Sequence, residues 1–252
     1  MSNILYQVEN RVARITLNRP NRLNTFTQDV YSELAIALRK AQHDDRVHVL
    51  LLSANGTDFS AGNDIKEFVG QMWSADKLAD KATPSTDIVF ALIELDKPLI
   101  ASVKGRAIGF GATMLLHCDA VIASESASVR YPFVDLGLVP EAGATALMER
   151  LVGHAKALRI FYEAKSILAD QALSLGIFSE VVGEDVLGML SLSYAERLAE
   201  KPLSALRATK RLFNRAPEPL EDRVIAEFRA LGDCLNSDAA QKAFKNFLNI
   251  QN

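Results

Sequence analysis

The segment Lys97-Pro-Leu-Ile-Ala-Ser-Val-Lys-Gly-Arg-Ala-Ile-Gly-Phe-Gly111 joins a short apolar run to three closely spaced glycines. The run Leu99–Val103 is too short for a buried helix, so it predicts a buried strand. The loop Lys104–Thr113 follows and runs into a helical pattern at Ala112–His117. A loop that enters a helix leaves the first N–H groups without intrahelical acceptors, and those groups can hold an anion.

A second glycine-bearing loop, Gly56-Thr-Asp-Phe-Ser-Ala-Gly-Asn-Asp-Ile-Lys-Glu-Phe68, follows another apolar run, Val47–Ser53. Glycines allow a ligand to approach the backbone closely, but they also simply form turns. On spacing alone, both interpretations stay open. The Gly-x-Gly at Gly109–Gly111 lacks the third glycine and the ribose-binding acid of a dinucleotide site, so we discard that possibility.

The rest of the chain predicts a mixed α/β architecture. Val12–Asn18 alternates between apolar and polar residues, as a half-buried strand does, and Ile4–Val8 is its expected hairpin partner. Thr27 is expected to cap a helix that follows it. Asp119–Ala123 predicts a third buried strand, and beyond it the chain reads as helical except for a strand at Phe178–Val182.

The last quarter of the chain reads as helices punctuated by prolines. We expect a core at 1–194 and a helical oligomerisation region at 195–252, with helices at Ala195–Glu200, Leu203–Phe213, Val224–Leu235 and Ala239–Leu248. The last two helices carry apolar stripes around Phe228 and Phe244. The stripes suit packing on the same domain or on a neighbouring subunit, and the sequence leaves both open.

Composition narrows the function classes. A net charge of −3 and the lack of a basic, aromatic-interleaved face argue against a nucleic-acid or anionic-membrane partner. Cys118 and Cys234 form no CxxC pair, and no apolar stretch approaches a membrane span. We therefore expect a cytoplasmic protein.

Four motifs in register resemble those of the crotonase (enoyl-CoA hydratase/isomerase) superfamily. Besides the opening segment, which continues to Cys118-Asp119, they are Asn18-Arg-Pro-Asn-Arg-Leu-Asn24, Phe59-Ser-Ala-Gly-Asn-Asp-Ile-Lys-Glu67 and Leu136-Gly-Leu-Val-Pro-Glu-Ala-Gly143. Their order and spacing hold from about Val12 to Val182. Each motif alone is modest, but the four together make the resemblance specific.

The resemblance implies a superhelix of ββα units with a C-terminal helical region that forms a homotrimer, or a hexamer as a dimer of trimers. It implies an acyl-CoA thioester substrate, no metal, and no cofactor, because coenzyme A is part of the substrate. Backbone N–H groups of Asn63 and Phe110 would form an oxyanion hole for the thioester enolate. The residues that would contact coenzyme A are Arg22, Leu23, Ala61, Asp64, Ile65, Lys66 and Gly111. For the charges of Arg22 and Lys66, an ordinary solvated surface role stays open.

Departures from the family pattern bear on the reaction. Hydratases of this family use two glutamates, and Thr113 and Phe133 stand at those positions here. Glu141, after Pro140, resembles the single catalytic glutamate of the peroxisomal-type Δ3,Δ2-enoyl-CoA isomerases. A glutamate just after a proline is also favoured at a helix start, so that interpretation stays open. Asp135 is a nearby carboxylate that we expect to be structural.

The preferred hypothesis is an isomerase that shifts the double bond of a 3-enoyl-CoA to the 2-trans position, since one carboxylate suffices for a 1,3-proton shift. The alternative is a hydratase or another crotonase-type reaction, such as thioester hydrolysis or C–C cleavage. We expect His117 and Cys118 to be packing residues, because adjacent helical residues point in different directions. The region Gln71–Thr86, with Trp73, is expected to shape the acyl pocket.

Overall fold

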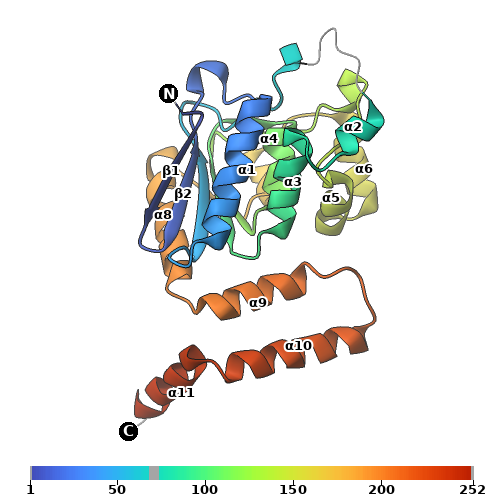
Figure 1. Cartoon of the computed structure of the whole chain (residues 1–252). Helices are drawn as coiled ribbons and strands as arrows, with labels where there is room; N and C mark the ends of the chain where they lie inside the picture. Colours follow the sequence, from blue (N-terminus) through green and yellow to red (C-terminus); the bar gives the residue numbers. More distant parts are fainter. Residues whose placement is uncertain (1, 68–73, 251–252) are drawn as a thin grey trace.

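A six-stranded sheet organises the core of the computed structural model, which describes residues 2–67 and 74–250 (Figure 1). The strand order is β1-β2-β3-β4-β6-β9. β1 and β2 form an antiparallel hairpin, and all other pairs are parallel. The strands are β1 (Ile4–Glu9), β2 (Val12–Leu17), β3 (Val49–Ala54), β4 (Leu99–Val103), β6 (Ala120–Ser124) and β9 (Glu180–Val182). The strands predicted from the apolar runs are thus confirmed.

Helices cover both faces of this sheet, which explains why its central strands are continuously apolar. α1 (Gln28–His43) and α3 (Pro84–Glu94) pack on one face, and α8 (Glu184–Ala199) packs on the other. Thr27 caps α1 as predicted, and its side chain accepts a hydrogen bond from the N–H of Val30. Side chains that alternate along the central strands β3, β4 and β6 enter one or the other of two apolar clusters, one per face.

A second, three-stranded sheet consists of β5 (Arg106–Ile108), β7 (Ser128–Arg130) and β8 (Ile167–Leu168). The sequence gives no signal for this sheet, because strands of two or three residues are too short to show a hydrophobic period. The chain alternates between the sheets: β4 and β6 of the large sheet are each followed by a strand of the small sheet and then by helical turns. This is the ββα winding expected from the resemblance.

The helical turns after these strand pairs complete the core. They are α4 (Phe110–Thr113), the 3₁₀ segments η3 (Met114–His117) and η4 (Val134–Leu136), α5 (Ala144–Val152), α6 (His154–Glu163) and α7 (Ala169–Ser174). The surface elements η1 (Pro20–Arg22), η2 (Ile65–Glu67) and α2 (Ala75–Ala79) lie in the connections. None of the described helices combines the length and apolar composition that a membrane span requires.

Three helices, α9 (Leu203–Phe213), α10 (Leu220–Leu235) and α11 (Asp238–Ile250), extend away from the core (Figure 1). Ion pairs dock α9: Arg207 lies 2.8 Å from Asp96, and Arg211 contacts the same carboxylate. Lys210 lies 2.7 Å from Asp119. The helix predicted at Ala195–Glu200 is the end of the longer α8.

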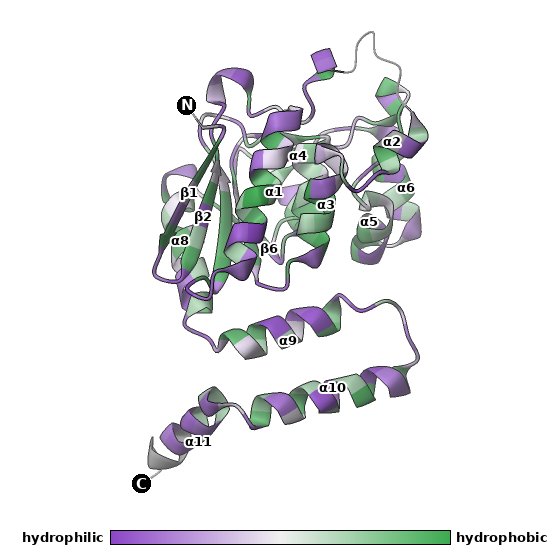
Figure 2. Ribbon diagram, in the orientation of Figure 1, coloured by the Kyte–Doolittle hydropathy of each residue, from purple (hydrophilic) through white to green (hydrophobic). Residues whose placement is uncertain are grey.

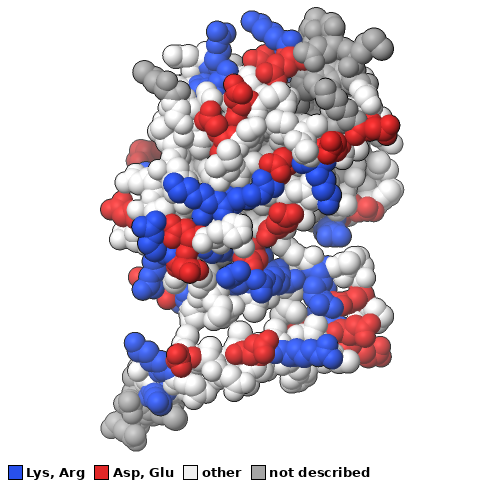
Figure 3. Space-filling model, in the orientation of Figure 1, with Lys and Arg blue, Asp and Glu red and all other residues white. Residues whose placement is uncertain are grey.

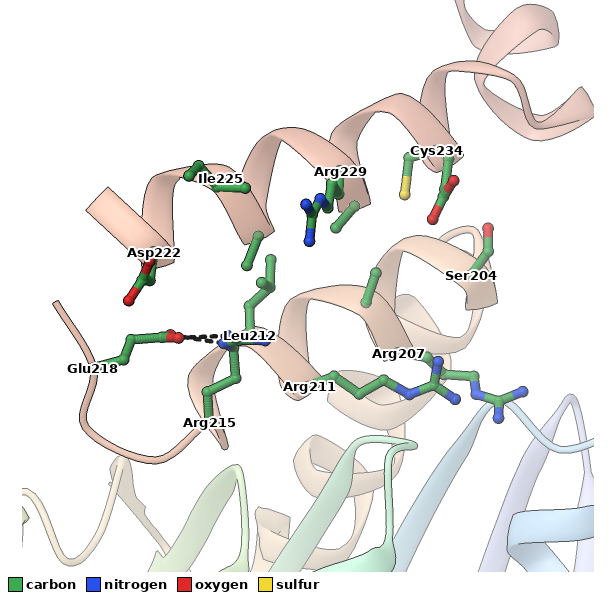
Figure 4. A pocket seen from close by; sticks show the side chains of 14 residues that line it. Ser204, Arg207, Arg211, Leu212, Arg215, Glu218, Asp222, Ile225, Arg229 and Cys234 are labelled. Carbon is green, nitrogen blue, oxygen red and sulfur yellow. Dashed lines mark hydrogen bonds and ion pairs between the residues drawn. The ribbon is translucent and has the colours of Figure 1, made fainter. Parts of the chain in front are cut away.

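α10 lies alongside α9 but is separated from it by a cleft that mixes charged and apolar side chains (Figure 4). No residue of α10, which is described over its whole length, is buried. Apolar and polar residues alternate along both helices (Figure 2), and the Phe228 side chain is 68% exposed. Within one chain the apolar stripe of α10 therefore stays uncovered.

The expected division into 1–194 and 195–252 stays a proposal. α8 continues across this boundary, and the first break in helix after it lies at Glu200–Pro202. We place the start of the helical region there.

Candidate active site

The two glycine loops meet backbone to backbone at Gly62 and Gly109. Both residues have positive φ, +82° and +55°, which favours glycine. A Cβ on Gly62 would lie 2.5 Å from the carbonyl oxygen of Ile108, and one on Gly109 would lie 4.0 Å from the Cα of Gly62. At position 62 only a residue without a side chain permits this approach, which brings the following residues of the two loops, Asn63 and Phe110, close together.

Strand-like hydrogen bonds fix the two loops to each other. The N–H of Ile108 donates to the carbonyl of Ser60 at 2.9 Å, and the N–H of Ser60 donates to that of Arg106 at 3.0 Å. The N–H groups of Asn63 and Phe110 have no acceptor among residues 2–67 and 74–250. The closely packed loops thus offer two backbone donors that no described group uses.

Side chains beneath the loops hold these two residues in place. The ring of Phe110 is buried edge-on against Phe26 and Tyr31, with centroid distances of 4.8 and 4.9 Å. The hydroxyl of Tyr31 donates to the side-chain oxygen of Asn63. Burial raises the pKa of Tyr31 well above its ordinary value, so this hydroxyl keeps its proton. Tyr31 was not predicted as a site residue, because in the sequence it resembles any other buried residue of an amphipathic helix.

Glu141 lies next to the second loop through Thr113. The buried hydroxyl of Thr113 lies 2.6 Å from a carboxylate oxygen of Glu141 and 3.3 Å from the carbonyl oxygen of Phe110. Burial raises the pKa of Glu141 to about 7, and the hydrogen bond from Thr113 opposes that rise. Thr113 therefore joins the carboxyl group to the backbone of a residue with an unused N–H.

Glu141 is not a helix-start residue, and that alternative was wrong. α5 begins at Ala144 with Gly143 as its N-cap, three residues beyond Glu141. Ala142 and Gly143 both have left-handed backbone, with φ of 55° and 70°. The carboxyl group thus sits in a tight turn before the helix.

The other residues with candidate chemistry occupy structural positions. Asp135 forms an exposed ion pair with Arg130 at 2.9 Å. Phe133 is buried. Burial of the Cys118 thiol raises its pKa to about 12, which excludes a reactive thiolate near neutral pH. His117 was expected only to pack, but its Nε2 lies 2.8 Å from the carbonyl oxygen of Ala142. Across the described residues, no group of His, Cys, Asp and Glu has the arrangement of a metal site.

Six of the seven residues expected at coenzyme A lie on two adjacent connections, and the seventh, Gly111, lies in α4. The N–H of Ala61 donates to the carbonyl of Leu23 at 2.9 Å, which joins these loops. Asp64 accepts from the N–H of Lys66 at 3.2 Å. The side chains of Arg22, Ile65 and Lys66 are exposed, and Gly111 is buried against Ser60.

In the described part of the chain, neither Arg22 nor Lys66 forms an ion pair. Positive and negative side chains are otherwise interspersed over the face shown in Figure 3. Trp73 lies outside the described residues, and the role expected for Gln71–Thr86 stays a prediction.

Replacing Thr113 by Val should raise the pKa of Glu141 further. The hydroxyl donates to the ionised carboxylate, and a hydrogen bond to a charged group contributes about 1.5–3 kcal/mol, or about one to two pH units. We expect the titration midpoint of the Glu141 carboxyl to move above its present value of about 7. Carbon-13 NMR of glutamate-labelled protein measures it, with Glu141→Gln identifying the signal. Thr209→Val, at an exposed position on α9, is the control, and an unchanged midpoint in Thr113→Val would contradict the role of the hydroxyl.

Comparison with known proteins gives the family. The family model described as "Enoyl-CoA hydratase/isomerase" matches residues 7–251. The 1,2-epoxyphenylacetyl-CoA isomerase of Escherichia coli K12 is 35% identical over 227 residues, which is 86% of this chain and 83% of that protein. The short-chain-enoyl-CoA hydratase of Clostridium acetobutylicum is 31% identical over 251 residues, covering 98% and 95%.

A solved structure from Geobacillus kaustophilus HTA426, described as "Enoyl-CoA Hydrates Subunit I", superposes with a TM-score of 0.92 at 30% identity, covering 98% of this chain and 95% of that one. The relatives include both an isomerase and a hydratase, so similarity at this level does not resolve the branch. The match over nearly the whole chain and the shared fold establish that this protein belongs to the enoyl-CoA hydratase/isomerase (crotonase) superfamily.

Proposed function

We propose that this enzyme is an acyl-CoA isomerase that shifts the double bond of a 3-enoyl-CoA to the 2-trans position. One observation carries the proposal: the carboxyl group of Glu141, with a pKa that burial raises to about 7, lies beside the loops with unused N–H groups through its hydrogen bond to Thr113. The positions at which hydratases hold their glutamates are Thr113 and Phe133. A 1,3-proton shift needs one proton carrier and no water.

In the first step, ionised Glu141 removes a proton from C2 of the substrate. The C–H electron pair becomes the C1–C2 double bond of an enolate, and negative charge develops on the thioester oxygen. The N–H groups of Asn63 and Phe110 would stabilise that oxygen, and such donors typically contribute about 10²–10³ in rate each. A pKa near 7 keeps a large fraction of Glu141 ionised at neutral pH.

In the second step, protonated Glu141 returns its proton to C4. The enolate electrons re-form the thioester carbonyl and the C2–C3 double bond, and the former C3–C4 double bond supplies the pair that binds the proton. The Thr113 hydroxyl suits both states of Glu141: it can donate to the carboxylate, or accept from the carboxylic acid while donating to Phe110.

The second candidate function is hydration or another crotonase-type reaction on the same oxyanion hole. The resemblance to a short-chain-enoyl-CoA hydratase favours it, since that protein aligns over almost the whole chain. Incubation with a panel of 3-enoyl- and 2-enoyl-CoAs, followed by product identification, separates the two functions. The isomerase proposal requires 2-trans-enoyl-CoA from a 3-enoyl-CoA and little 3-hydroxyacyl-CoA. We also propose that the enzyme acts in the cytoplasm.

Glu141→Gln should lose a factor of about 10²–10⁴ in kcat for isomerisation, because general acid–base catalysis contributes about that much. The fold should survive. The folded-state pKa of Glu141 lies above the unfolded value, so burial of its charge opposes folding increasingly as pH rises from about 4.5 to about 7. A neutral Gln escapes this effect, and the variant should resist urea at pH 8 at least as well as the native protein.

Asp135→Asn is the matched control and should keep its activity. Turnover of Glu141→Gln within a few-fold of the native enzyme would end the isomerase proposal.

We propose that Arg22 and Lys66 bind the phosphates of coenzyme A, because both are exposed and lie beside the loops of the hole. Arg22→Ala and Lys66→Ala should each raise KM about fivefold, which corresponds to about 1 kcal/mol for an exposed charge pair. The change in kcat should be smaller, since phosphate contacts stabilise ground and transition states alike. KM of the native enzyme should also rise with salt. Lys201→Ala, between α8 and α9, is the control; a fall in kcat without a rise in KM would refute this placement.

We propose that the chain assembles as a trimer or a dimer of trimers through its C-terminal helices. Phe213, Leu220 and Phe228 are 81%, 76% and 68% exposed in one chain, so a partner is needed to cover them. Light scattering at micromolar concentration should give three or six times the chain mass of 27.6 kDa. Phe228→Asp should shift the distribution toward smaller species. A native protein that remains monomeric would refute the proposal.

A further inference from the structure

His117 lies at the end of η3 and reaches the turn that carries Glu141. Its Nε2 lies 2.8 Å from the carbonyl oxygen of Ala142, the residue directly after Glu141. A carbonyl can only accept, so Nε2 carries the hydrogen and donates. The ring is partly buried, and burial lowers its pKa, which favours the neutral form near pH 7.

The turn it contacts has little regular structure to hold it. Ala142 has φ of 55°, a conformation that strains any residue with a Cβ, and Gly143 follows at 70°. The turn has one backbone bond of its own, from the N–H of Ala144 to the carbonyl of Glu141 at 2.9 Å. A strained turn persists only when neighbouring groups hold it in place. The hydrogen bond from His117 is one contact that can hold the Ala142 turn in its left-handed conformation.

The contacts to this turn come from the segment that also supplies half of the oxyanion hole. Phe110, Thr113 and His117 belong to the continuous helical segment of α4 and η3. Thr113 binds the carboxylate of Glu141, and His117, four residues later and about one turn further on, binds the backbone after it. One short segment thereby sets the position of the carboxyl group relative to the N–H of Phe110.

We propose that His117 is a positioning residue for Glu141, holding the strained Ala142 turn so that the carboxyl group faces the oxyanion hole. The inference rests on the proposed role of Glu141 as the proton carrier. His117 does not touch the substrate and transfers no proton. A displacement of about 1 Å at a reacting group can lower a rate by about 10²-fold, so loss of this hydrogen bond should reduce turnover.

Two substitutions separate the hydrogen bond from the volume of the ring. His117→Gln keeps an N–H donor at a similar reach, whereas His117→Met fills the space with a flexible side chain that cannot donate. We expect His117→Met to lose at least about tenfold in kcat with KM within about threefold, and His117→Gln to stay within about threefold of the native enzyme in both. Circular dichroism and thermal unfolding of both variants establish that they are folded.

Equal losses in both variants, or native kcat in a folded His117→Met, would overturn the proposal. If His117→Met does not fold, the contact is needed for folding and the positioning role also falls. Exchange of the C2 hydrogen of an acyl-CoA in D₂O separates failure of the positioning role of His117 from failure of the proposed isomerase function. An enzyme that exchanges this hydrogen but does not isomerise refutes the isomerase assignment, and the exchange rates of the two variants then decide the role of His117. If the native enzyme neither isomerises a 3-enoyl-CoA nor exchanges this hydrogen, Glu141 is not a base toward acyl-CoA and both proposals fall.

Discussion

The contact between Gly62 and the backbone at Ile108–Gly109 is the constraint on which the rest of the site depends. It requires two loops, from two different strands of a parallel sheet, to approach within a distance that no Cβ allows. The carboxyl ends of β3 and β4 lie at the same edge of the sheet, which delivers both loops there. Backbone donors placed this way need no side-chain chemistry, so Asn63 and Phe110 can use their side chains to anchor the loops on Tyr31 and Phe26. The close contact between the loops therefore both fixes the backbone of Asn63 and Phe110 and leaves their N–H groups without an acceptor among the described residues.

Two opposing effects set the ionisation of Glu141. Burial favours the neutral acid, and the Thr113 hydroxyl favours the carboxylate. Their balance leaves the pKa near 7, so neither protonation state is strongly disfavoured at neutral pH. A second glutamate at position 113 would place a like charge beside Glu141, whereas Thr supplies a hydrogen bond that tolerates both states. In the proposed mechanism, Thr113 therefore replaces one glutamate of the hydratase pair and also leaves Glu141 able to carry the proton alone.

The sequence predicted the structure best where a single physical requirement, such as burial on both faces of a strand, determines the local conformation. Leu99–Val103 is buried on both faces, so a short apolar run predicted its bounds to the residue. The strand Arg106–Ile108 was missed because it lies inside a glycine loop and has only three residues. Glu141 was compatible with a helix start because nothing in the sequence marks Ala142, a residue with a Cβ, as left-handed. The contacts of Tyr31 and His117 depend on which loop faces each helix, which is decided by tertiary packing and not by local pattern.

The strand that leads into the second glycine loop, β4, also anchors α9 at its opposite end. Just before β4, buried Asp96 binds Arg207 and Arg211, and the carbonyl of Lys97 accepts from Lys210 at 3.0 Å. Charged groups dock α9 there, whereas apolar groups dominate the exposed stripe of α10. The partly buried ion pairs of α9 weaken with salt or acid, whereas burial of the α10 stripe against a partner would weaken on cooling. Anchorage lies at the amino end of β4 and the second glycine loop at its carboxyl end, so the full length of the strand separates α9 from the N–H group of Phe110.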